Sequence, residues 1–239
     1  MSARRGCLLS LLVSGVLAAC GPVEGAAERG QALFQSPSFA PSKINNYSCA
    51  TCHGQSPEDH QKRILPGAWL GGVTERAAFW GGAETDLLRA LNACRAEFQV
   101  TPVGLEADDP DASELYAYLV SLEPKQPGVV DFTVVEEIEN IPRGDASLGQ
   151  AMYAKACGYC HGEIHSGQGR LSRRIPILPE DTIDAHDGYT PRLLRLVFIE
   201  KVRHGAFLNY GGDMPPFSAE VLSDTELADI LETLGARGE

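Results

Sequence analysis

The sequence has few basic residues and almost no long hydrophobic run, and each shortage excludes a class of protein. There are 20 Lys and Arg residues against 32 Asp and Glu residues, so the formal net charge is −12 at pH 7. Nucleic-acid binding requires clustered cations that face phosphates, so we expect no nucleic-acid partner. After residue 20, no stretch approaches the roughly 18 apolar residues with which one helix crosses a bilayer.

The longest apolar run lies at the N-terminus and has the pattern of an export signal. Two arginines precede it, and the run itself, Cys7–Ala19, has the length of a signal-peptide core. Its end, Leu17–Gly21 (LAACG), resembles a bacterial lipobox, in which a cysteine after small residues is lipidated and becomes the mature N-terminus. We therefore expect residues 1–19 to be a lipoprotein signal peptide and Cys20 to carry the lipid. The alternative is ordinary signal cleavage near the same place, with no role for Cys20.

The remainder of the chain contains an internal repeat of about 110 residues. Each copy begins with Gly-Gln-Ala in a stretch of helical spacing and then reaches a Cys-x-x-Cys-His-Gly motif. Four stretches have the apolar spacing of a helix, one at each end of each copy: 27–34, 112–122, 147–156 and 223–234. In the last of them, Ser223 and Glu226 form a predicted capping box. A repeat of this kind predicts a duplicated domain.

The repeat divides the mature chain into a first domain (20–123), a linker (124–144) and a second domain (145–239). The linker contains three prolines and a β-leaning run, 129–135, which predicts a short strand. The first copy has an insertion, 35–48, rich in Pro, Ser and Asn and predicted to be a loop. Because the other segments are helical stretches joined by Gly- and Pro-rich loops, the predicted fold class is all-α.

The two Cys-x-x-Cys-His motifs predict covalently bound haem c. Two thiols at this spacing can form thioethers with the two vinyl groups of one porphyrin, and the adjacent histidine then ligates the iron. With seven cysteines and six histidines in the chain, the motif is expected about 0.005 times by chance. A zinc site would need four ligands, and a thioredoxin-like pair would need a βαβ context. The motifs therefore predict two haem groups, one bound by Cys49, Cys52 and His53 and the other bound by Cys157, Cys160 and His161.

Both copies resemble class I cytochrome c domains, over residues 27–122 and 145–236. The resemblance implies two tandem helical domains, each built around one haem. It also implies a methionine as sixth iron ligand, in a loop before the last helix. Met214, within Gly212–Phe217 (GDMPPF), occupies that place 53 residues after His161. A thioether ligand would raise the potential of the second iron.

The first haem has no such ligand, because methionine is scarce. The chain has three methionines, and none lies between His53 and the end of the first domain: Met1, Met152 and Met214. Once the lipid, the signal and the haems are assigned, the only cysteine left is Cys94. It shares one helical face with three apolar residues, Leu87, Leu91 and Phe98, in a helix that we expect Thr85 to cap. Cys94 either ligates the first iron or fills core space, in which case that iron is open or bound by His60.

The segment Leu91–Cys94, followed by Phe98, is similar to a stretch in dihaem thiosulfate dehydrogenases and related sulfur-oxidation cytochromes. The resemblance implies a cysteine thiolate on the first haem. Those relatives usually carry a methionine shortly after the cysteine, where this chain has Gln99–Thr101. Three arginines are candidates to hold a small sulfur anion there: Arg76, Arg89 and Arg95. We also expect Trp69, Phe79 and Trp80 to surround this haem, and His165, His186 and His204 to be surface or haem-edge residues.

The leading hypothesis is an exported dihaem cytochrome, lipid-anchored on the periplasmic side of a bacterial membrane, that transfers electrons between redox partner proteins. The alternative is an enzyme similar to thiosulfate dehydrogenase, which oxidises a sulfur compound at the first haem with Cys94 as axial ligand. A third hypothesis leaves the first iron open as a sensor of small ligands.

Overall fold

The computed structural model describes residues 25–205 and 212–238, and within these ranges the chain consists of helices and loops. The α-helices are α1 (Ala26–Gln35), α2 (Cys49–His53), α3 (Pro57–Lys62), α4 (Leu87–Glu97), α5 (Pro110–Ser121), α6 (Ala146–Ala156), α7 (Gly158–His161), α8 (Glu180–Ala185), α9 (Pro191–His204) and α10 (Asp224–Thr233). Three short 3₁₀-helices accompany them, η1 (Pro37–Phe39), η2 (Val73–Glu75) and η3 (Trp80–Gly82). The all-α prediction is confirmed. No helix in the described ranges has the length and apolarity to cross a membrane.

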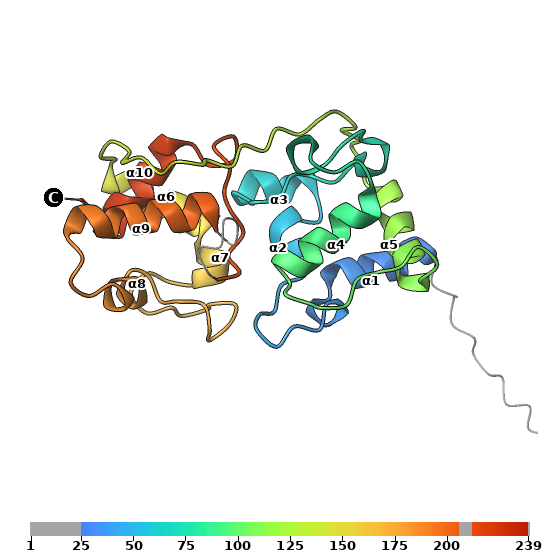
Figure 1. Cartoon of the computed structure of the whole chain (residues 1–239), viewed down its shortest axis with the longest axis horizontal. Coiled ribbons are helices and arrows are strands. Elements are labelled where there is room, and N and C mark those ends of the chain that lie inside the picture. The colour runs from blue at the N-terminus through green and yellow to red at the C-terminus, as the bar shows by residue number, and fades with distance from the viewer. Residues whose placement is uncertain (1–24, 206–211, 239) are drawn as a thin grey trace, which may run out of the picture.

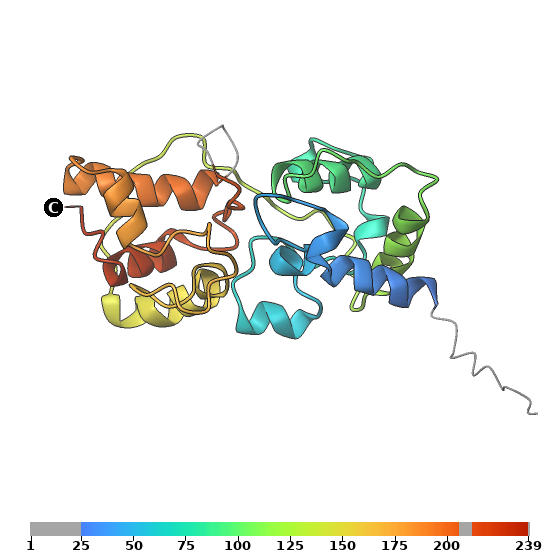
Figure 2. The same ribbon diagram turned by 90° about the horizontal axis from the view of Figure 1, so that it is seen from below.

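The helices gather in two lobes, α1 to α5 in one and α6 to α10 in the other (Figures 1 and 2). Each lobe has its own cluster of buried apolar residues. Residues 123–145 run as an extended segment from the first lobe across the second. The boundaries 20–123, 124–144 and 145–239 remain predictions, and the signal segment and Cys20 lie outside the described residues.

Each lobe is built on a crossing of its first and last helices, and a glycine makes each crossing close. In the first lobe α1 packs on α5, and a Cβ added at Gly30 would lie 2.0 Å from the Glu114 carbonyl oxygen. In the second lobe α6 packs on α10, and a Cβ at Gly149 would lie 1.9 Å from the Asp229 carbonyl oxygen. The glycine of the repeated Gly-Gln-Ala is thus the residue at which the two backbones touch.

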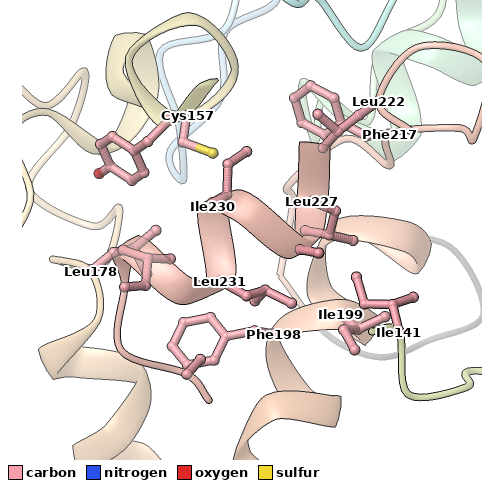
Figure 3. Packing of buried hydrophobic residues seen from close by; sticks show 14 residues of the cluster. Ile141, Cys157, Leu178, Phe198, Ile199, Phe217, Leu222, Leu227, Ile230 and Leu231 are labelled. Atoms are coloured by element: carbon pink, nitrogen blue, oxygen red, sulfur yellow. The ribbon is translucent and has the colours of Figure 1, made fainter. Parts of the chain in front are cut away.

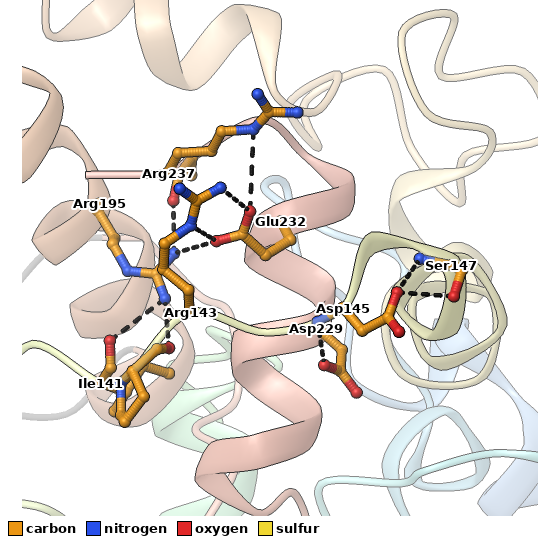
Figure 4. A network of polar contacts seen from close by, with 10 residues as sticks. Ile141, Arg143, Asp145, Ser147, Arg195, Asp229, Glu232 and Arg237 are labelled. Carbon is orange, nitrogen blue, oxygen red and sulfur yellow. Dashed lines mark hydrogen bonds and ion pairs between the residues drawn. The ribbon is translucent and has the colours of Figure 1, made fainter. Parts of the chain in front are cut away.

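The second lobe has the larger core. Figure 3 shows Phe198 and Ile199 of α9 around Leu227, Ile230 and Leu231 of α10, with the Cys157 sulfur pointing into the cluster. A polar network lies beside this core, where the fully buried Arg195 donates to the carbonyl oxygens of residues 141, 142 and 236 (Figure 4). The buried guanidinium is therefore held by hydrogen bonds, as an isolated charge in the core would be costly.

Most predicted elements form, with two differences. The four terminal helices lie at the predicted places, and the Ser223–Glu226 capping box is present. The cap of α4 is Asp86, whose carboxylate accepts from the Arg89 amide at 2.8 Å, and not Thr85. The predicted strand at 129–135 was wrong, because no strand is assigned there. Instead, Phe132 packs against Trp80 of the first lobe with ring centroids 5.9 Å apart, and the Thr133 amide donates to the Glu220 carboxylate of the second lobe at 3.2 Å.

Candidate haem sites

The first Cys-x-x-Cys-His motif forms the short helix α2, which begins with a capping box. The Ser48 amide donates to the Thr51 hydroxyl at 3.0 Å, so the polar residue between the two cysteines fixes the start of the turn. Cys49 and Cys52 are free thiols three residues apart on this turn. Gly54, with φ 65°, ends the helix in a conformation that favours glycine.

The second motif repeats the helical turn and its glycine end, without the capping box. Cys157 ends α6 and also starts the single turn α7, which carries Cys160 and His161. Gly162, with φ 72°, ends the turn as Gly54 does in the first lobe. Both cysteines are free thiols, and His161 is buried. The repeat in the sequence is therefore also a repeat in local backbone geometry.

The histidines of the two motifs form equivalent hydrogen bonds from Nδ1 to a backbone carbonyl. His53 Nδ1 lies 2.8 Å from the Ala68 carbonyl oxygen, and His161 Nδ1 lies 2.9 Å from the Pro176 carbonyl oxygen, in each case 15 residues along the chain. A carbonyl only accepts, so Nδ1 carries the proton and Nε2 keeps its lone pair for a metal. Burial lowers the pKa of both imidazoles, which favours the neutral form that ligates iron.

A cavity opens beside the first motif, with about 1250 Å³ of empty space that is partly open to solvent. Its walls come from α1, α2, α4, α5, the 66–80 segment and the linker, and most lining residues are apolar. All three residues of the first motif line it, Cys49, Cys52 and His53. A pocket of this character, with two thiols and a ligating histidine on its wall, fits a covalently bound haem.

Cys94 lines the same cavity, together with the three apolar residues that share its helical face. The prediction that Leu87, Leu91, Cys94 and Phe98 face inward is confirmed, and the inward space is the cavity. Burial raises the pKa of the Cys94 thiol to about 12, so the protein alone does not produce a thiolate there. Ionisation of Cys94 would require a bound metal, which lowers the pKa of a thiol that it ligates.

His60 is not among the residues that line the cavity. Its Nε2 lies 3.0 Å from the His53 carbonyl oxygen, and its ring packs edge-on to Trp69 at 6.2 Å. Of the aromatic residues predicted around the first haem, Phe79 and Trp80 line the cavity, whereas Trp69 lies in the core and donates to the Pro124 carbonyl at 2.9 Å.

Two of the three candidate arginines lie at the cavity. Arg76 donates to the Trp69 carbonyl oxygen at 2.6 Å, and Arg95 stacks on the Phe39 ring at 4.5 Å from its centroid. Neither forms an ion pair with a described residue, so both retain a positive charge for an anion such as a haem propionate. Arg89 instead forms an exposed ion pair with Glu84 at 2.8 Å, away from the cavity. Gln99, which replaces the methionine region of the similar sulfur-oxidation cytochromes, is buried in the cavity wall, and its Oε1 has no hydrogen-bond partner among the described residues.

The Met214 segment lies between the lobes. Met214 is partly buried against the same core cluster that contains Cys157. Its neighbours Pro215 and Pro216 line the cavity of the first lobe, and the Asp213 carboxylate accepts from the Asn45 side-chain amide. One short segment therefore contacts both the core of the second lobe and the cavity of the first, which the sequence pattern did not reveal.

The other histidines have partners away from the two motifs. His165 pairs with Glu180 at 2.6 Å, and His186 Nδ1 lies 2.8 Å from the Thr182 carbonyl oxygen. His204 was expected at the surface or at a haem edge but is fully buried, with its Nε2 against the Val135 carbonyl oxygen. It packs the linker onto the end of α9.

A family model described as cytochrome c oxidase, cbb3-type, subunit III matches residues 144–232. Residues 144–232 are a cytochrome c domain. This domain implies covalently bound haem and redox partner proteins, as predicted for the second lobe. Among solved structures, thiosulfate dehydrogenase (TsdBA) from Marichromatium purpuratum is similar, with a TM-score of 0.37 and 16% identity over 89% of this chain and 46% of that chain. The present chain thus spans about half of that structure's length. No curated protein sequence matches it.

Proposed function

We propose that the chain is an exported dihaem cytochrome c that transfers electrons between redox partner proteins. The observation that carries the proposal is the repeated geometry of the two motifs. In both, the cysteines lie on a short helical turn, and the histidine Nδ1 donates to a carbonyl 15 residues later. The cytochrome c domain at 144–232 supplies the second haem site, and the cavity beside His53 is the proposed first site.

When bound, each haem supplies a one-electron iron couple whose potential depends on its ligands and burial. His53 and His161 would hold one axial position in each lobe, oriented by their carbonyl partners. Met214 is the proposed second ligand in the second lobe, and Cys94 in the first. Because a thiolate lowers the potential of an iron and a thioether raises it, this pair of side chains would direct electrons from the first lobe to the second.

The haem count tests this proposal. A pyridine haemochrome assay with the protein mass should give two haems per chain. Cys49→Ala with Cys52→Ala, and Cys157→Ala with Cys160→Ala, should each leave one. As a control, Cys94→Ala should keep both covalent haems, because that cysteine forms no thioether. A wild-type protein with one haem would contradict the dihaem proposal.

Oxidation of a small sulfur anion at the first haem is the second candidate function. It is supported by Cys94 and Arg76, which line one cavity, where Arg76 has no carboxylate partner among the described residues. Thiosulfate should then reduce the purified protein, and Cys94→Ser and Arg76→Met should abolish the reduction. Arg89→Met is the matched control, because Arg89 lies away from the cavity. A wild-type protein that thiosulfate does not reduce would remove this candidate.

Spectroscopy of the oxidised protein separates the ligand alternatives for the first iron. A low-spin thiolate signal in electron paramagnetic resonance that disappears in Cys94→Ser would support Cys94 as ligand. A high-spin signal, with carbon monoxide binding after reduction, would support the open-iron hypothesis instead.

Anchoring through Cys20 is the proposed localisation, on the periplasmic side of a bacterial membrane. Its support is the LAACG sequence at the end of the apolar run. Cells grown with labelled palmitate should label the wild-type protein, and Cys20→Ser should lose the label and release the chain from the membrane fraction. Label that persists in Cys20→Ser would contradict the proposal.

A further inference from the structure

A single arginine lies where the two motif turns meet. Arg63 directly follows α3, the helix of the first lobe that lies on the side facing the second lobe (Figures 1 and 2). Its Nη2 donates to the Thr51 carbonyl oxygen at 3.0 Å, and its guanidinium carbon lies 3.8 Å from the centroid of the Tyr159 ring. Arg63 therefore contacts both lobes through one planar group.

The two residues that Arg63 contacts occupy equivalent positions. Thr51 immediately precedes the second cysteine of the first motif, and Tyr159 immediately precedes the second cysteine of the second. The side chain thus joins the same position of the two repeats. Because Thr51 and Tyr159 each adjoin a motif cysteine, these two contacts place the positive charge of Arg63 beside both motifs.

Neighbouring backbone makes the contact between lobes part of a larger interface. The Ile64 amide donates to the Lys155 carbonyl oxygen at 3.1 Å, and the Ile64 side chain packs against the core cluster of the second lobe. Arg63 itself forms no ion pair with any described residue, so no carboxylate there neutralises its charge. A positive charge that no carboxylate neutralises favours the reduced state of a nearby redox site, because reduction removes one positive charge from that site. It therefore raises the midpoint potential of the site.

We propose that Arg63 is a positioning residue that holds the two haem-attachment turns against each other and places one positive charge beside both. This inference rests on the proposed dihaem function for its effect on potential. The mechanical part, the joining of the lobes through Thr51 and Tyr159, does not depend on how many haems are bound.

Amide exchange at Ile64 tests the mechanical part directly, since its hydrogen bond crosses between the lobes. Tyr159→Leu removes the stacking partner of Arg63 and leaves the neighbours of Ile64 unchanged. We expect the Ile64 amide to lose about tenfold in protection, the factor that corresponds to about 1.4 kcal/mol. The matched control is Tyr116→Leu, since Tyr116 is 51% exposed and Tyr159 is 45% exposed. Unchanged protection in Tyr159→Leu would overturn the positioning role.

Redox titration tests the charge. Arg63→Met should shift both midpoint potentials to more negative values, and Arg63→Lys should retain most of the wild-type values, because it keeps the charge. Lys62→Met is the control, which removes an exposed cation one residue away and should shift the potentials less. If Arg63→Met moved only one potential or neither, or if Lys62→Met moved both equally, the proposal would be wrong. A wild type with a single haem would instead contradict the dihaem function, and the exchange result would still decide the positioning role.

Discussion

The glycine at the crossing of α6 and α10 offers the sharpest test of the packing. In Gly149→Ala, the new Cβ would lie 1.9 Å from the Asp229 carbonyl oxygen and 2.2 Å from the Thr233 hydroxyl. The Asp229 oxygen belongs to the backbone of α10 and cannot move as the tip of a long side chain can. The two helices must therefore separate to accept the methyl group.

The expected cost follows from two opposing effects. Overpacking of a close contact costs about 1–3 kcal/mol and sometimes more, while alanine gains up to about 1 kcal/mol over glycine inside a helix. Since the clash is with backbone and lies far inside van der Waals contact, we expect the upper part of that range to apply. The second lobe should thus lose about 2 kcal/mol of its free energy of unfolding.

Urea unfolding, followed by circular dichroism, measures this loss, and the same lobe provides a control. A Cβ at Gly158 would meet its nearest atom at 3.6 Å, an ordinary contact, and the equivalent position in the first motif is already Ala50. Gly158→Ala should therefore be neutral or slightly stabilising. If Gly149→Ala unfolded within about 0.5 kcal/mol of the wild type, the crossing would not be as close as described.

Three further outcomes are expected in the polar contacts. Arg143 holds the pKa of the buried Glu232 carboxyl below its usual value. The stabilisation from this pair should be complete above the pKa of Glu232 in the unfolded chain and should be lost as the pH falls through its lower pKa in the folded protein. Glu232→Gln should remove this pH-dependent part of the free energy of unfolding in urea titrations. Arg195→Met should cost about 3 kcal/mol in the same assay, because it leaves buried carbonyl groups unpaired. Asn45→Ala should accelerate amide exchange within 212–217, whereas a neutral result would separate that segment from the first lobe.

Much of the site was predictable because its signals are local or periodic. The Cys-x-x-Cys-His motifs fix the residues of each turn within five positions, and the apolar spacing around Cys94 placed its face correctly toward the cavity. The helix ends followed from capping patterns such as Ser223 with Glu226. In each case, the interaction that determines the structure lies within a few residues of the sequence that predicts it.

The predictions that were wrong depend on contacts between residues far apart in the sequence. The β-leaning run at 129–135 forms no strand, because a strand needs a partner strand and this segment instead contacts side chains of both lobes, Trp80 in the first and Glu220 and His204 in the second. Trp69 has the size expected of a haem neighbour, yet its Nε1 finds the Pro124 carbonyl and its ring fills the core. Neither contact can be predicted from residue type alone, because Phe132 and Trp80 are 52 residues apart and Trp69 and Pro124 are 55 residues apart.

The segment around Met214 argues against treating the two repeats as independent cytochromes. Asp213 bonds to Asn45 in the insertion of the first lobe, and the next residue packs on the core of the second. Pro215 and Pro216 then close the cavity of the first lobe. A change that moves this segment must alter the sixth-ligand position proposed for one haem and the wall around the other. The two proposed haem sites would therefore be coupled through shared backbone as well as through Arg63, and single substitutions at this interface should affect both.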